Sequence, residues 1–171
     1  MLHAIETLRI ARPDVQPVIV VAPSRTVEET RALMSEGNRE NVPLVQQETR
    51  EALAASDAAA VASGTATLEA ALLETPMVVV YKESPINWHT LGRLITVPHF
   101  GLVNLVAGKE IAKELMQEEL TGKNLANELL KLLEPKANRA ARESLREVAR
   151  RLGEPGASQR AAEVIVRFLQ D

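Results

Sequence analysis

The sequence predicts an α/β fold in which helices cover both faces of a parallel β-sheet. Short apolar runs alternate with segments of helical periodicity in the first part of the chain, and the runs are apolar on both faces. Only helical patterns follow after Asn104. With 171 residues and 46% hydrophobic content, the chain can bury one good core. We therefore expect a Rossmann-like nucleotide-binding domain at residues 1–121 and a helical carboxyl-terminal tail at residues 122–171.

The elements of the first part follow in order. Apolar residues around Leu8 predict an opening helix, which Pro13 ends. The first strand of a doubly wound sheet, with its phosphate loop, is therefore expected to be missing. Four buried strands are expected at Val18–Ala22, Val42–Val45, Asp57–Ala62 and Met77–Tyr81. Helices are expected between them at Val27–Glu36, Thr49–Ala55 and Thr65–Leu73.

The second part predicts four helices, at Lys109–Glu118, Lys123–Leu133, Ala137–Leu152 and Ser158–Leu169. Residues 136–153 include six basic and two acidic side chains, a local charge of +4. One interpretation is a solvated helix face with pairs such as Arg139 with Glu143. The other is attraction of this helix to anionic lipid headgroups.

Composition excludes several classes of protein. The net charge of −3 and the four aromatic residues argue against a nucleic-acid partner. Cysteine is absent, and His3, His89 and His99 share no ligand spacing, so no metal site is expected. No apolar run approaches the roughly 20 residues that span a bilayer, and no signal peptide is visible. We expect a soluble, cytoplasmic protein that needs no cofactor.

The segment from Ser63 to Glu69 is the strongest candidate site. Ser63, Gly64 and Thr65 stand where a buried strand gives way to a helix, and such a turn presents free backbone N–H groups to a phosphate. Glu69 lies in the first turn of the helix. Its carboxylate either favours the helix dipole or accepts hydrogen bonds from the sugar hydroxyls of a nucleotide.

Three further residues carry weaker signals. Asn104 is expected in a loop or strand end, as a turn residue or as a contact to a diphosphate or sugar. Arg25, after Ser24, is expected in an exposed turn, with anion contact as the alternative. Trp88 is expected at a half-buried helix start that packs on the core.

Three motifs together resemble those of the lipid-A-disaccharide synthase family. They are Ser56–Ala70, Thr75–Lys82 and Val103–Glu110, the last followed by Glu114–Gln117. The resemblance runs from about Ala4 to the end of the chain. It covers only the second half of a family member.

The resemblance implies a GT-B glycosyltransferase of two Rossmann-like halves, of which this is the half that binds the UDP-sugar donor. The family transfers 2,3-diacylglucosamine from UDP to 2,3-diacylglucosamine 1-phosphate and releases UDP. It therefore implies donor contacts by a set of residues in this chain: Ser63, Gly64, Thr65, Ala66, Glu69, Tyr81 and Asn104. Lys82 would border the site beside Tyr81. Charge on the departing UDP would be stabilised by backbone N–H groups rather than by a metal.

The sequence departs from the family pattern in three respects. The Gly-Ser-Arg loop expected ahead of the first helix would precede Met1. Val103 stands where the family usually has Pro, which changes the stiffness of the segment around Asn104. The acceptor-binding half and any general base would also lie outside this chain, so the catalytic residues are unknown. We expect the chain alone to be inactive.

Several alternatives stay open on the sequence. They are another GT-B enzyme with a UDP-N-acetylglucosamine donor, a UDP-sugar epimerase of similar architecture, and a non-catalytic nucleotide-binding remnant. The expected ligands are UDP-2,3-diacylglucosamine and the acylated glucosamine 1-phosphate acceptor. Contact with the inner face of the cytoplasmic membrane and formation of a homodimer are further expectations.

Overall fold

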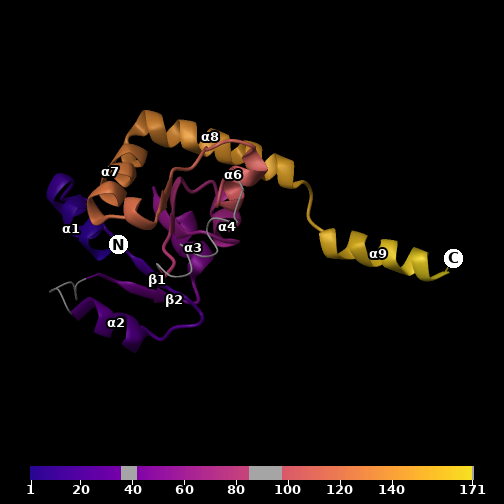
Figure 1. Cartoon of the computed structure of the whole chain (residues 1–171), viewed down its shortest axis with the longest axis horizontal. Coiled ribbons are helices and arrows are strands. Elements are labelled where there is room, and N and C mark those ends of the chain that lie inside the picture. Colours follow the sequence, from indigo (N-terminus) through magenta and orange to yellow (C-terminus); the bar gives the residue numbers. More distant parts are fainter. Residues whose placement is uncertain (36–41, 85–97, 171) are drawn as a thin grey trace.

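The computed structural model describes residues 1–35, 42–84 and 98–170, and it confirms the α/β class (Figure 1). The described strands form two parallel sheets. The first sheet pairs β1 (Ile19–Val21) with β2 (Leu44–Gln46). The second has the order β3 (Ala59–Ala62), β4 (Met77–Tyr81), β5 (Glu114–Met116).

Helices connect the strands and fill the carboxyl-terminal part. Ahead of β4 they are α1 (Leu2–Ala11), α2 (Val27–Ser35), α3 (Thr49–Ala54) and α4 (Ala66–Leu72). After β4 they are α6 (Leu102–Ala107), the 3-10 turn η2 (Gln117–Glu119), α7 (Gly122–Leu133), α8 (Pro135–Leu152) and α9 (Ala157–Gln170). The helices predicted before β4 and the last three helices are thereby confirmed, with ends shifted by one or two residues. Glu36, the predicted end of α2, lies outside the described residues.

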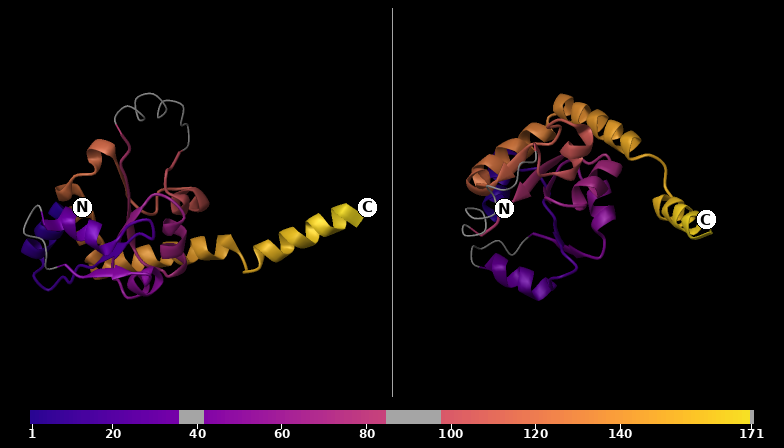
Figure 2. Two further views of the ribbon diagram at one scale, coloured as in Figure 1. Left: turned by 90° about the horizontal axis from the view of Figure 1, so that it is seen from below. Right: turned by 45° about the vertical axis from the view of Figure 1, so that its right-hand side comes forward.

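The sheet β3-β4-β5 is the centre of the fold because helices cover it on both faces (Figure 2). Alternate side chains of β4 point to opposite faces. Val79 packs in the cluster with α4, α6 and α8, whereas Val78 and Val80 pack in the cluster with α1 and α7. All three valines of β4 are buried. The continuous apolar run of this strand is thus explained by a central position.

The prediction of one four-stranded sheet is wrong. β1 and β2 form a separate two-stranded sheet with no ladder to β3. Each of these two strands has only three residues, and β2 has no fully buried residue. Of their six residues only Val21 is buried, so these two strands contribute little apolar surface to a central layer.

The predicted helix at Lys109–Glu118 is also wrong. Gly108 ends α6 in a left-handed conformation, with φ of +69°, and the chain then turns back toward the sheet. Residues 114–116 form β5, which pairs with β4 in parallel. Leu115 is buried, and it packs with Val78 and Val80 of β4. Tertiary burial of a three-residue strand has overridden a helical composition.

Arginines of α8 bind the carboxyl ends of three other helices. Arg142 Nη1 donates to the Glu74 carbonyl at 2.9 Å and Nη2 to the Ser56 carbonyl at 3.4 Å, just past α4 and α3. Arg151 Nη1 donates to the Ala107 carbonyl at 2.8 Å, at the last residue of α6. The last carbonyls of a helix lack intrahelical partners, and Arg151 satisfies one of them at Ala107. Arg142 instead bonds carbonyls two residues beyond α3 and α4. The arginines of α8 therefore hold this helix against the ends of α3, α4 and α6.

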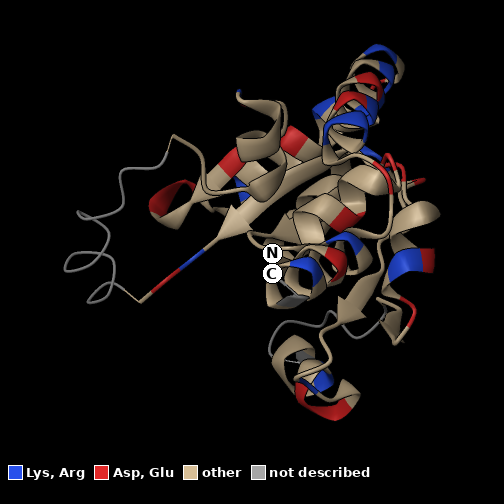
Figure 3. Cartoon of the chain, turned by 90° about the vertical axis from the view of Figure 1, so that its right-hand side faces the viewer, with Lys and Arg blue, Asp and Glu red and all other residues tan. Residues whose placement is uncertain are grey.

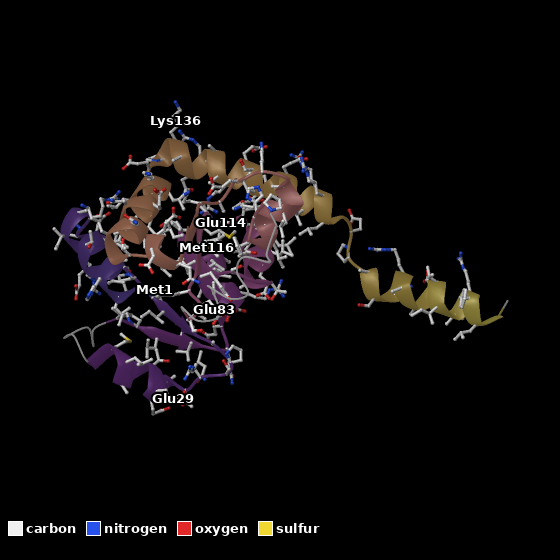
Figure 4. All side chains as sticks on the ribbon, viewed as in Figure 1. Met1, Glu29, Glu83, Glu114, Met116 and Lys136 are labelled. Carbon is white, nitrogen blue, oxygen red and sulfur yellow. The ribbon has the colours of Figure 1, made fainter. Side chains whose placement is uncertain are left out.

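The predicted pair of Arg139 with Glu143 does not form. Glu143 accepts instead from Arg146, with Nη1 to Oε2 at 2.9 Å, and Arg146 also bridges to Glu74. Acidic residues lie among the basic ones along α8 (Figure 3). Lys136 points outward from the ribbon (Figure 4). Arginines of α8, among them Arg146 and Arg150, thus form ion pairs within the protein.

α9 projects away from the body as a separate amphipathic helix (Figures 1 and 2). Its apolar side chains are exposed, including Ile165, Phe168 and Leu169, and Phe168 is 82% accessible. An isolated helix of this length is marginally stable in water, so its apolar face needs a covering partner. Among the described residues, no helix is both long and apolar enough to cross a bilayer.

Candidate functional site

The predicted site residues before α6 gather at the carboxyl edge of the sheet β3-β4-β5. The pairing register sets Ala62 beside Val80, so Ser63 follows at the level of Tyr81, and Tyr81 pairs with Met116. The Ser63 N–H donates to the Val80 carbonyl at 2.9 Å, which extends the ladder by one bond. In open α/β sheets, ligands bind in the crevice outside the carboxyl ends of the strands.

The turn from β3 into α4 depends on Gly64. Its φ of +147° is a conformation that side chains rarely adopt, and a β-carbon built there would meet nothing within 4 Å. The Thr67 hydroxyl donates to the Gly64 carbonyl at 2.7 Å, and Thr67 is fully buried. This bond fixes the carbonyl on the inner side of the turn and leaves open space on the outer side.

The backbone donors of this turn are unused. Within the part of the chain that the structure describes, the N–H groups of Gly64, Thr65 and Ala66 have no acceptor. The first N–H groups of a helix lack intrahelical partners, and unpaired donors next to one another suit an anion. The geometry therefore provides three backbone donors beside an open space.

Glu69 lies in the first turn of α4, as predicted, and its side chain is exposed. No group among the described residues bonds its carboxylate, although its N–H donates to the Thr65 carbonyl at 3.2 Å. An exposed, unpaired carboxylate on the helix that starts at the open turn is available to accept bonds from hydroxyl groups. The structure is thus compatible with both interpretations that the sequence left open.

The hydroxyl groups of Ser63 and Tyr81 are both engaged. Ser63 Oγ donates to the Phe100 carbonyl at 2.9 Å, which ties the turn to the segment ahead of α6. Tyr81 donates to Glu83 Oε2 at 2.8 Å. This bond, with the negative charge of Glu83 and partial desolvation, raises the pKa of Tyr81 above its ordinary value of 10.0. Tyr81 therefore stays a neutral phenol at neutral pH.

Asn104 is placed differently from the prediction. It lies inside α6, not in a loop or strand end, and it is fully buried. Its Oδ1 accepts from the N–H groups of Ile111 and Ala112, at 2.9 Å each. Its Nδ2 donates to the Ala112 carbonyl at 2.7 Å and to Glu114 Oε1 at 2.8 Å. Both amide hydrogens and both oxygen lone pairs are thus used inside the protein.

Sequence reasoning missed a buried carboxylate in this region, that of Glu114. Its Oε2 accepts from the Phe100 N–H and its Oε1 from the Gly101 N–H, at 2.9 Å each, besides the bond from Asn104. Glu114 is 9% exposed and lies within the body of the molecule (Figure 4). A charged residue in what looked like a helical segment gave no signal of burial. Only the strand pairing of β5 shows it.

The remaining candidate residues show no hydrogen bond to the turn among the described contacts. His3 lies 3.7 Å from Glu6 on α1, and His99 is half-buried ahead of α6. Arg25 is exposed, as expected, and its carbonyl accepts from Gln46. Within residues 1–35, 42–84 and 98–170, no group of three potential ligand side chains could hold a metal ion. The predictions for Trp88 and His89 concern residues outside the described ranges.

Of two depressions among the described residues, the larger lies elsewhere. It measures about 460 Å³ and lies between Lys113, which precedes β5, and the α7 residues Asn124, Asn127 and Lys131. None of the predicted site residues lines it. It is open, and its two lysines are paired with Glu110 and Glu128. We therefore place the candidate site at the turn and not in this depression.

Comparisons with known proteins match one family over nearly the whole chain. A family model described as lipid-A-disaccharide synthetase matches residues 1–168. Curated relatives carry the name lipid-A-disaccharide synthase. The chain is 43% identical over 174 residues to that of Anaeromyxobacter dehalogenans (strain 2CP-C), which covers 99% of this chain and 45% of the relative.

Other relatives repeat this result. The chain is 39% identical over 170 residues to the protein of Syntrophus aciditrophicus (strain SB), covering 97% of this chain and 44% of the relative. It is likewise 39% identical over 170 residues to that of Myxococcus xanthus (strain DK1622), covering 99% of this chain and 44% of the relative. The chain thus spans less than half the length of the curated relatives that it matches.

Proposed function

This chain belongs to the lipid-A-disaccharide synthetase family, and from that premise we propose that it is the half of a glycosyltransferase that binds the UDP-sugar donor. The complete enzyme would join 2,3-diacylglucosamine, carried on UDP, to 2,3-diacylglucosamine 1-phosphate. The single observation that supports this role best is the open turn at Gly64 with three unused backbone donors. It stands at the edge of the sheet where α/β proteins bind nucleotides.

We place the UDP diphosphate at this turn. The N–H groups of Gly64, Thr65 and Ala66 would donate to its oxygens. As the bond between the anomeric carbon and UDP breaks, negative charge develops on the leaving phosphate. Fixed donors aimed at that charge lower the barrier without reorganising. The acceptor hydroxyl would form the new bond to the anomeric carbon and pass its proton to a general base. We assign this base to no residue of the chain.

Side chains around the turn would hold the rest of the donor. Glu69 would accept from the ribose hydroxyls, since its carboxylate has no partner among the described residues. Tyr81, at the end of the neighbouring strand, would border the site with its neutral phenol. Asn104 would act indirectly, because a direct contact with the donor would require it to give up internal bonds. Its proposed role is to hold residues 111–114 against α6.

The proposal also covers the location and the oligomeric state of the enzyme. Because both substrates carry acyl chains, we propose a cytoplasmic protein that acts at the inner face of the membrane. Most arginines of α8 hold hydrogen bonds within the fold, so these side chains are less available to lipid headgroups. We also propose a homodimer in which the apolar face of α9 is covered. Light scattering with Phe168→Glu tests it: loss of a dimer supports the proposal, and an unchanged mass contradicts it.

Calorimetry with three ligands tests the function and separates it from its alternatives. The ligands are UDP, UDP-N-acetylglucosamine and UDP-2,3-diacylglucosamine, each titrated into the full chain. We expect UDP to bind, Glu69→Ala to weaken it by about 1–3 kcal/mol, and the acylated donor to bind at least as tightly as UDP. Preference for the non-acylated sugar would favour another UDP-N-acetylglucosamine transferase. Absence of UDP binding would refute a donor site on this chain.

Product analysis tests the enzymatic part. The chain would be incubated with acylated donor and acceptor, alone and with the separately produced amino-terminal portion of a curated relative. We expect disaccharide and free UDP only in the mixture. Release of UDP without acceptor would favour an epimerase-like or hydrolytic enzyme. No product in either sample, with UDP binding intact, would favour a non-catalytic nucleotide-binding remnant.

A further inference from the structure

We propose that Glu114 is a positioning residue of the donor site, which acts on Ser63 through the Phe100 peptide. This inference rests on the proposed function, because it concerns how the same turn receives its ligand. Glu114 lies at the start of β5, fifty-one positions from Ser63 in the sequence numbering. Two hydrogen bonds connect the residues through the Phe100–Gly101 peptide: its Gly101 N–H donates to Glu114, and its Phe100 carbonyl accepts from Ser63 Oγ.

The carboxylate holds its end of this connection firmly. It is 9% exposed and accepts three hydrogen bonds, from Phe100 N–H, Gly101 N–H and Asn104 Nδ2, at 2.8–2.9 Å. Bonds to an ionised carboxylate are stronger than bonds between neutral groups. Asn104 is itself fixed by Ala112 and Ile111. The Phe100–Gly101 peptide is thus held from one side by a charged and fully bonded partner.

Gly101 leaves little room for a side chain between β4 and Glu114. A β-carbon there would lie 3.1 Å from Val79 Cγ2 and 3.2 Å from Glu114 Oε1. The backbone at Gly101 therefore rests directly on β4 and on the carboxylate. The Gly101 N–H donates to Glu114 Oε1 at 2.9 Å and belongs to the same planar peptide as the Phe100 carbonyl. This bond therefore sets the direction of the carbonyl that accepts from Ser63.

The fixed acceptor determines what Ser63 can offer a ligand. A serine hydroxyl has one hydrogen to donate and two lone pairs to accept with. Its hydrogen is directed to the Phe100 carbonyl, so the oxygen presents lone pairs to the open side of the turn. Ser63 therefore accepts from an O–H or N–H donor of the nucleotide sugar, such as a sugar hydroxyl or the uracil N–H. Phosphate oxygens, which only accept, are left to the backbone N–H groups of the turn.

A double-mutant cycle on UDP affinity tests this connection. Glu114→Gln keeps the shape but turns an amide NH₂ toward one of the backbone N–H donors. We expect it to weaken UDP binding about three- to tenfold in a chain with Ser63. In a Ser63→Ala chain, Glu114→Gln should lower UDP affinity by less than about twofold. The reason is that the hydrogen bond from Ser63 to Phe100 is already absent. Equal losses in both backgrounds would show a general structural effect and overturn the proposal.

Controls separate positioning from folding. Glu119→Gln, an exposed carboxylate three residues past β5, should leave UDP affinity unchanged. Glu114→Asp keeps the charge and should recover part of the affinity. If the wild-type chain binds no UDP, the proposed function fails, and the connection is then decided without any ligand by the amide spectra described next.

The ligand-free measurement uses ¹H–¹⁵N correlation spectra of the full chain. Ser63→Ala changes only a half-buried surface side chain and should fold. We expect it to shift the amide resonances of Phe100 and Gly101, whose hydrogen bonds to Glu114 belong to the same chain of contacts. We also expect Glu114→Gln to shift the Ser63 and Gly64 amides. Unchanged Phe100 and Gly101 resonances in Ser63→Ala would contradict the connection, whether or not the Glu114 variant folds.

Discussion

The phenol of Tyr81 donates to the carboxylate of Glu83 at 2.8 Å, immediately past the end of the central strand β4. The pair stands at the edge of the sheet where Ser63 and Gly64 form the open turn. Three effects raise the pKa of Tyr81: the hydrogen bond to Glu83 is the largest, followed by the charge of Glu83 and then by desolvation. A phenol held in its neutral form is a hydrogen-bond donor and acceptor over the whole physiological range.

Alkaline titration should show this pair directly, because Tyr81 is the only tyrosine in the chain. A pKa that is higher in the folded state than in the unfolded state stabilises the protonated form. The contribution is fully present below pH 10.0 and is lost as the pH rises through the raised pKa. We expect the titration midpoint of the Tyr81 phenolate absorbance to lie above pH 10.0. In Glu83→Gln the midpoint should fall toward pH 10.0. Identical titrations of the two proteins would contradict the pairing.

Gly64 and Gly108 form a matched pair for testing the turn. Both have positive φ, +147° and +69°, and both have open space where a β-carbon would stand. Replacement by Ala should cost each about 1–2 kcal/mol of folding stability from backbone strain. Only Gly64→Ala should also lower UDP affinity, by about tenfold or more, since its methyl enters the proposed ligand space. Equal UDP affinities in the two variants would argue against a ligand at Gly64.

Arg142 should contribute to stability through the geometry of its guanidinium group. It bonds the carbonyls of Glu74 and Ser56 and the Asn138 side chain at once. Lysine keeps the charge but cannot present this fork, so Arg142→Lys should destabilise the fold by about 1–2 kcal/mol. Arg139→Lys, at an exposed position of the same helix, should have little effect. Urea unfolding of both variants measures the difference. Similar unfolding midpoints would show that the hydrogen bonds of Arg142 do not stabilise the fold.

Asn104 should be essential for folding rather than for ligand contact alone. Removing its amide in Asn104→Ala leaves the buried Ala112 backbone and the Glu114 carboxylate short of partners. We expect a loss of about 2–4 kcal/mol in the free energy of unfolding. Asn127→Ala, on the exposed side of α7, is the control and should change it little. A variant of unchanged stability but weak UDP binding would instead indicate that Asn104 contacts the donor.

The elements that carry the turn were predictable because their signals are local. The run at Met77–Tyr81 is apolar without alternation, and it is the buried central strand. The apolar spacing of Leu68 and Ala71 after the small residues at 63–65 identified α4 and its start. The long helices α7 to α9 followed from their periodicity and from Pro135 at the first position of α8.

The rest depends on contacts between distant segments, which a single sequence does not display. β5 has three residues, including the charged Glu114 and the flexible side chain of Met116, so its sequence does not indicate a strand. Only its pairing with β4 makes it one. Asn104 resembled a turn residue because small polar residues favour turns, yet a network with residues 111–114 buries it in α6. The separate sheet of β1 and β2 likewise reflects packing rather than local pattern.

The central claim is that a UDP diphosphate binds the backbone of the turn after β3. The most direct measurement is an amide correlation spectrum of the full chain, recorded while UDP is added. We expect saturable shifts centred on Gly64, Thr65 and Ala66, the unused donors beside the open space. Saturable shifts centred on Lys113, Asn124 and Asn127 at the larger depression, or no saturable shifts, would contradict it.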